Sequence, residues 1–216
     1  MLLPYRINTL LQCTPVTNWI LIGMTSLISL FLIFSDGDLV YGWVLNGWNP
    51  FGMIGHVFVH AGLWHLFGNM MFLWVFGNAI CGNTSNLIYP LLYFGFGLSA
   101  AIVHNVMDGD PAVGASGAIN GIVGMATAMY PRNGVGIFYF LFFRAGTFEM
   151  PLWGLSSIWL VIDFFRVLTG DSGVAAWAHI GGFLAGLVIG VVFLRKGIVK
   201  LTEWDNESLS DWLAQK

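Results

Sequence analysis

Charged side chains are scarce in this sequence, and that scarcity limits the kinds of protein it can encode. Of the 216 residues, 8 are Lys or Arg and 11 are Asp or Glu, together 9%, whereas soluble domains carry about 25%. Hydrophobic residues make up 57%, and the mean hydropathy is +0.77. A formal net charge of −3 offers no basic surface for a nucleic acid. These values exclude a soluble domain, a disordered chain and a nucleic-acid-binding protein, and they indicate an integral membrane protein.

Other features are lacking too. Two cysteines are too few for a disulfide framework. The absence of internal repeats argues against a repeat-built transporter. A His-Glu-x-x-His motif, which a zinc protease of the membrane would need, is missing. The two Asp-Gly-Asp stretches follow Ser35 and Met107 in expected loops, which does not suit an aspartyl protease of the membrane.

Apolar runs close to the length of a membrane helix, about 20 residues, occur six times. The fold prediction is therefore an all-α membrane protein with six transmembrane helices, in which the fourth is unusually rich in Gly and Ala. The apolar stretch 135–143 is too short to span and is interpreted as an interfacial or re-entrant piece of a loop. Residues 1–17 and 195–216 are predicted to flank the six-span core, 18–194. The six predicted spans cover residues 18–34, 58–80, 87–106, 113–130, 151–168 and 177–194.

The basic residues predict the orientation, because they concentrate on the cytoplasmic side of membrane proteins. Six spans place both termini on one side, and only Arg166 then falls on the other. We therefore predict cytoplasmic termini, and the compact core without a recognisable targeting segment favours the bacterial inner (plasma) membrane. The seven basic residues on the predicted inner side are Arg6, Arg132, Arg144, Arg195, Lys196, Lys200 and Lys216.

Polar side chains within the spans fall at one depth. The outer half of the second span carries His60, His65 and Asn69, the outer end of the fourth carries Ser116, and the start of the sixth carries His179. Polar groups inside a membrane are energetically expensive, so each is a candidate functional residue. Three helices thus bring polar groups together below the outer surface.

The chemistry of these residues suits nucleophilic catalysis. Ser116 follows Gly114 at a predicted helix start, where free N–H groups and the helix dipole favour a developing oxyanion. His179 is the candidate base for the serine proton. His65 and Asn69, spaced i,i+4, share one helix face and can donate hydrogen bonds to an oxyanion.

No acidic residue is predicted to complete a triad with this pair. Asp163 and Arg166 are spaced i,i+3 and are expected to pair with each other, so a Ser–His dyad is predicted. Glycine stripes predict close packing of the fourth and sixth helices. The stripes consist of Gly117, Gly121 and Gly124 on one helix and Gly182, Gly186 and Gly190 on the other.

The sequence resembles the rhomboid family of intramembrane serine proteases over residues 18–194. Three motifs in the same order carry the resemblance: His56-x3-His60-x4-His65-x3-Asn69, Gly114-Ala115-Ser116-Gly117, and Ala178-His179-Ile180-Gly181-Gly182 continuing to Gly186. The resemblance implies a six-helix bundle with a short central fourth helix around a water-filled cavity.

The resemblance also implies roles. Ser116 would be the nucleophile and His179 its general base, while His65 and Asn69 would form the oxyanion hole with the serine N–H. His60 would support the first outer loop. The implied partners are single-span membrane proteins, cut in or near the bilayer in regulated proteolysis, without metal or cofactor. The alternative is a catalytically silent relative that binds membrane helices for quality control.

Two positions depart from the family pattern. Phe51 and Gly52 replace the Trp-Arg pair that many members carry in the first outer loop, so the anchoring of that loop must differ. Asn120 replaces the aromatic residue that many members place four residues after the serine, and it is expected to hydrogen-bond His179 or a water. Nucleophile, base and oxyanion donors are all present, so an active enzyme is predicted.

Overall fold

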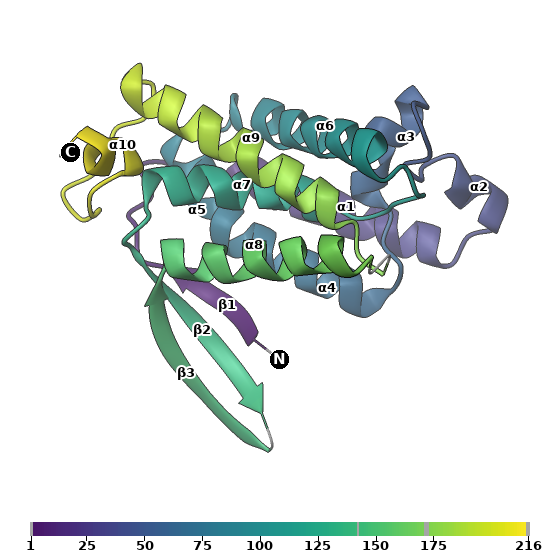
Figure 1. Cartoon of the computed structure of the whole chain (residues 1–216), viewed down its shortest axis with the longest axis horizontal. Helices are drawn as coiled ribbons and strands as arrows, with labels where there is room; N and C mark the ends of the chain where they lie inside the picture. The colour runs from purple at the N-terminus through teal and green to yellow at the C-terminus, as the bar shows by residue number, and fades with distance from the viewer. Residues whose placement is uncertain (1, 142, 171–172, 215–216) are drawn as a thin grey trace.

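The protein is mostly helical, and its helices form a bundle that carries a small sheet at one side (Figure 1). The computed structural model describes residues 2–141, 143–170 and 173–214. Within these residues, four helices are long and apolar enough to cross a membrane. They are α1 (Val16–Ile33), α6 (Tyr89–Met107), α8 (Leu152–Thr169) and α9 (Ala176–Arg195).

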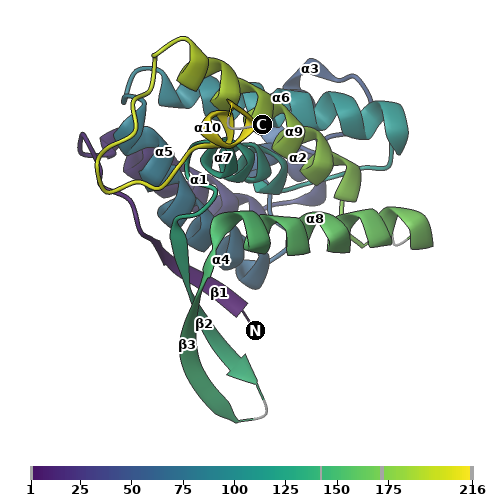
Figure 2. The same ribbon diagram turned by 60° about the vertical axis from the view of Figure 1, so that its left-hand side comes forward.

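Two of the six predicted spans contain no single helix of spanning length. The second is a helical run composed of α4 (Leu63–Phe72), a π-helical turn η2 (Leu73–Gly77) and α5 (Asn78–Asn83). The fourth is α7 (Ser116–Met129), which lies in the middle of the bundle (Figure 2) and is almost entirely buried. Short helices complete the fold: α2 (Gly37–Tyr41), α3 (Pro50–Gly55), η1 (His56–Phe58) and α10 (Leu209–Ala214).

A three-stranded antiparallel sheet corrects the all-α prediction. Its order is β1 (Leu2–Ile7), β2 (Gly134–Leu141) and β3 (Arg144–Pro151). The stretch 135–143, interpreted above as a re-entrant or interfacial loop, is thus mostly the middle strand of this sheet. β-Branched and aromatic side chains favour an extended backbone, and pairing with β1 and β3 satisfies the backbone groups that a short helix would leave open at its ends.

Helices α7 and α9 run parallel and in close contact, as the glycine stripes predicted. A Cβ atom on Gly182 would collide with the carbonyl oxygen of Gly117, and one on Gly186 would collide with that of Gly121. The backbones therefore touch without intervening side chains. Since both helices begin at the same end of the bundle, their N-terminal residues lie side by side.

Candidate active site

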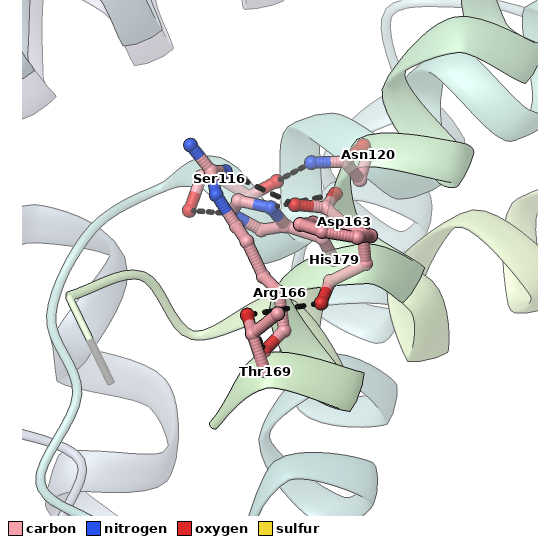
Figure 3. Close-up of polar contacts among 7 residues, drawn as sticks. Ser116, Asn120, Asp163, Arg166, Thr169 and His179 are labelled. Atoms are coloured by element: carbon pink, nitrogen blue, oxygen red, sulfur yellow. Dashed lines mark hydrogen bonds and ion pairs between the residues drawn. The ribbon is translucent and has the colours of Figure 1, made fainter. Parts of the chain in front are cut away.

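Ser116 and His179 meet at the shared end of α7 and α9. Ser116 is the first residue of α7, and His179 lies in the first turn of α9. The Ser116 Oγ is 2.8 Å from the Nε2 of His179 (Figure 3). The structure thus brings together the two residues that the sequence paired, at a distance suited to proton transfer from the hydroxyl to the imidazole.

Asp163 is the third member of this hydrogen-bonded chain, contrary to the prediction that no acidic residue would reach the pair. Its Oδ2 lies 3.0 Å from the Nδ1 of His179, and its side chain is 7% exposed. The pairing with Arg166 is confirmed, because the Arg166 Nη1 lies 3.2 Å from Oδ1 of the same carboxylate. A carboxylate has two oxygens that accept hydrogen bonds, so the pairing with Arg166 leaves Oδ2 for His179.

His65 approaches the serine from α4. Its ring lies so close to Gly114 that a Cβ there would be 2.9 Å from the His65 Cε1. Gly114 also has a φ of +120°, a backbone conformation that favours glycine. The Gly114 N–H donates to the carbonyl of His56, so Gly114 shapes the site through its backbone and its missing side chain.

The hydrogen bonds of His65 define its tautomer. The backbone N–H of Ala61 donates to the His65 Nδ1 at 3.3 Å, so that nitrogen is the acceptor and the proton of the neutral ring is on Nε2. The Nε2 atom lies on the side of Gly114. It can therefore donate to an oxyanion formed beside Ser116.

The two asparagines of the site bond to their own helices. Asn69 donates from Nδ2 to the carbonyl of His65 at 2.9 Å, and the second N–H of its amide remains available to a ligand. Asn120 donates to the carbonyl of Ser116 at 2.9 Å. The expected bond from Asn120 to His179 is thus corrected: the side chain bonds back to the carbonyl four residues earlier, an ordinary alternative for polar side chains in helices. The alternative bond to a water stays a prediction.

His56 and His60 hold the segment before α4. The His60 Nδ1 lies 2.9 Å from the Ser29 Oγ on α1. His56 is buried, and its Nδ1 lies 3.0 Å from the carbonyl oxygen of Gly52. Burial lowers the pKa of His56, whose ordinary value is 6.5. At the position of the missing Trp-Arg pair, the rings of Phe51 and Trp43 pack in an edge-to-face arrangement with centroids 4.9 Å apart.

A cavity of about 860 Å³ surrounds these side chains. It is large enough for a peptide segment and water, and its remaining wall includes Phe72 of α4 and Trp159 and Ile162 of α8. Within the described residues, no group of three or more His, Cys, Asp or Glu side chains is arranged to hold a metal ion. The polar residues that line the cavity include Ser116, His179, Asp163, His65, Asn69 and Asn120.

Helices of spanning length around a half-buried serine and histidine and a buried carboxylate define an integral membrane protein with a polar site that lines a cavity. The Rhomboid domain model matches residues 47–196, most of the chain, and the protein belongs to the rhomboid family.

Curated relatives agree with this assignment at low identity. The chain is 26% identical to RHOMBOID-like protein 12, mitochondrial, from Arabidopsis thaliana, over 67% of its own length and 46% of the relative. It is 27% identical to Rhomboid protein 1, mitochondrial, from Saccharomyces cerevisiae, over 74% of its length and 46% of the relative. The chain therefore spans about half the length of these relatives. Both are named mitochondrial, and the bacterial inner membrane stays a prediction for this chain.

Proposed function

We propose that the protein is an intramembrane serine endopeptidase that cuts single-span membrane proteins in or near the bilayer. The observation that supports this most directly is the 2.8 Å contact between the Ser116 Oγ and the His179 Nε2 inside the cavity. A serine is a weak nucleophile until a base takes its proton, and this contact supplies the base. In this proposal six helical segments cross the membrane, with α7 as the short central one and both termini on the cytoplasmic side.

Acylation begins when the Ser116 Oγ attacks the carbonyl carbon of the scissile bond. The serine proton moves to the His179 Nε2, and the carbonyl oxygen becomes an oxyanion. The Nε2–H of His65, the free amide N–H of Asn69 and the first-turn N–H groups of α7 stabilise that charge. His179 then protonates the leaving amine. A water, deprotonated by the same histidine, hydrolyses the acyl-enzyme and restores the serine.

The substrate must present an extended segment. In a helix the scissile carbonyl already accepts a hydrogen bond and is shielded by neighbouring side chains. The cavity wall suggests access between α4 and α8, where Phe72 and Trp159 close the gap with their ring centroids 4.8 Å apart. Separation of these two rings would admit a chain from the bilayer to Ser116.

Reconstituted protein and a model single-span substrate with a helix-destabilised segment test the proposal. Wild type is expected to produce two fragments, and Ser116→Ala and His179→Ala are expected to produce none while remaining folded. Mass spectrometry of the fragments locates the cut. Wild-type protein that binds such substrates without cutting any of them would overturn the proposal and favour a catalytically silent, helix-binding rhomboid.

A further inference from the structure

The Asp163 carboxylate lies within hydrogen-bond distance of His179, the proposed base. It is held by two partners at once, with Arg166 on Oδ1 at 3.2 Å and His179 on Oδ2 at 3.0 Å. The carboxylate comes from α8, the serine from α7 and the histidine from α9. Three different helices therefore converge on one hydrogen-bonded chain, and Figure 3 shows Asp163 and Ser116 on opposite sides of the imidazole.

We propose that Asp163 is a positioning residue that completes a Ser116–His179–Asp163 triad. This inference rests on the proposed function and extends it. A carboxylate acceptor at Nδ1 keeps the proton of the neutral imidazole on that nitrogen and leaves the Nε2 lone pair for the serine proton. When Nε2 takes that proton, the ring becomes a cation and the ionised carboxylate stabilises it. The Nδ1 proton stays on the ring.

Arg166 has a supporting role in the same arrangement. Its charge offsets the cost of keeping a carboxylate in a buried position, and its hydrogen bond restricts rotation of the Asp163 side chain. The i,i+3 spacing on α8 makes this contact local. Loss of the guanidinium is therefore expected to weaken the orientation of His179 without removing its acceptor.

Substitution of Asp163 by Asn tests the role with little change in size. An amide can place its N–H group against Nδ1, so that the imidazole proton moves to Nε2 and blocks acceptance of the serine proton. The expected result is a fall in kcat of about 10²-fold or more, with little change in KM and an equal fall in the labelling rate by a fluorophosphonate. Asp38→Asn, the same change at an exposed site in α2, is the matched control and should cleave like wild type.

Rescue of activity by a second carboxylate distinguishes a positioning role of Asp163 from a purely structural one. Asp163→Glu restores a carboxylate and should recover part of the kcat, whereas Arg166→Gln should lower kcat less than Asp163→Asn. The inference is overturned if Asp163→Asn cleaves and labels like wild type, or if Asn and Glu variants lose activity in proportion to lost thermal stability. An inactive wild-type protein would instead remove the proposed function itself.

A second observation concerns the β2–β3 hairpin, in which the outer half of β2 is apolar on both faces. Successive side chains of a strand point to opposite faces. Phe138 and Phe140 lie on one face, Tyr139 and Leu141 lie on the other, and Phe143 beside the turn is 96% exposed. A hairpin surrounded by water would carry polar residues on at least one face. This one projects from the bundle (Figures 1 and 2).

The surroundings of the hairpin indicate what covers it. β3 ends at Pro151, and the membrane-spanning α8 follows directly. The sheet also contacts the bundle on two sides, with β1 against α4 and both β2 and β3 against α8. The sheet therefore joins the bundle beside α8, whose exposed side chains, such as Trp153 and Ile158, are apolar.

We infer that the outer half of this hairpin binds the interfacial layer of the bilayer. The headgroup layer suits it better than the hydrocarbon core, because β3 is an edge strand whose outward backbone groups need water. Arg144, which is exposed beside Phe143, can reach lipid phosphates from that depth while the phenylalanines contact acyl chains.

An environment-sensitive fluorophore on the hairpin tests this inference. The exposed Cys13 is replaced by Ser, the buried Cys81 is kept, and NBD is attached at Phe143→Cys or, as a matched exposed control, at Glu203→Cys. In vesicles of phosphatidylcholine and phosphatidylglycerol, the label at 143 should emit at shorter wavelength and be quenched by lipid nitroxides, unlike the label at 203. Equal, water-like emission at both sites would overturn the inference, as would shielding at 143 that depends on protein concentration, which would indicate a second copy.

Discussion

Gly186→Ala is the sharpest perturbation of the scaffold that holds the site. A Cβ at this position would collide with the carbonyl oxygen of Gly121 on α7. Carbon–oxygen contacts of this kind normally lie at about 3.3 Å or more, so α9 would have to retreat from α7 by more than about 1 Å. Overpacking against a rigid backbone typically costs about 1–3 kcal/mol of folding free energy, and we expect the upper end of that range.

The same displacement of α9 would also lengthen the contact between Ser116 and His179. His179 lies two turns before Gly186 on α9, and its Nε2 is 2.8 Å from the Ser116 Oγ. An added ångström would carry the pair beyond about 3.5 Å, where little hydrogen bonding remains. Misplacement on this scale can cost about 10²-fold in rate. The assay is the rate of fluorophosphonate labelling in mild detergent, measured together with the free energy of unfolding.

Gly95→Ala on α6 is the matched control, because a Cβ at Gly95 would meet no atom within 4 Å. Alanine has the higher helix propensity, so this variant should be as stable as wild type or slightly more stable, with an unchanged labelling rate. If Gly186→Ala labels at the wild-type rate with wild-type stability, the backbone contact between α7 and α9 does not set the geometry of the site.

Three further predictions follow from individual contacts. His65→Ala and Asn69→Ala should each lower kcat by about 10²–10³-fold, the usual cost of one lost oxyanion donor, while substrate binding in a pull-down is retained; unchanged kcat in both would exclude them from the oxyanion hole. Asn120→Ala should cleave within a few-fold of wild type, because this side chain bonds to the Ser116 carbonyl and not to the base; a loss as large as that of His179→Ala would contradict this assignment. Burial lowers the pKa of His56 in the folded protein, so the unfolded chain binds more protons at this residue as the pH falls. The contribution of neutral His56 to the free energy of unfolding is therefore complete above about pH 6.5 and declines below that value. Thermal unfolding of wild type and His56→Gln across pH 5–8 measures this contribution, and parallel stability profiles of the two proteins would refute the prediction.

The sequence was most informative where local rules apply. Glycines spaced three or four residues apart predicted which faces of α7 and α9 could touch, and that contact brings Ser116 to His179. Polar groups are costly in lipid, so the few that occur within apolar runs pointed to the site. The i,i+4 spacing of His65 and Asn69 likewise placed both on the cavity side of α4.

Contacts between elements that are far apart in the sequence could not be predicted from such local patterns. Asp163 was missed because its pairing with Arg166 is local and looked complete, whereas its contact with His179 depends on the rotation of α8 against α9. The β2–β3 hairpin was missed because an apolar stretch of this length is ambiguous without its partners, and β1 lies more than 120 residues away in the chain. The Asn120 side chain donates to the backbone carbonyl of Ser116 on its own helix and does not contact His179.

The most direct test of the central claim is the identity of the residue that a fluorophosphonate modifies. The probe reacts with a serine whose proton a neighbouring base can accept, and peptide mass spectrometry locates the adduct without knowledge of the natural substrate. A single adduct on Ser116, absent in His179→Ala, is the predicted result. A folded wild-type protein with no adduct on Ser116, or with equal labelling of Ser116 in His179→Ala, would contradict the assignment of Ser116 as nucleophile and His179 as its base.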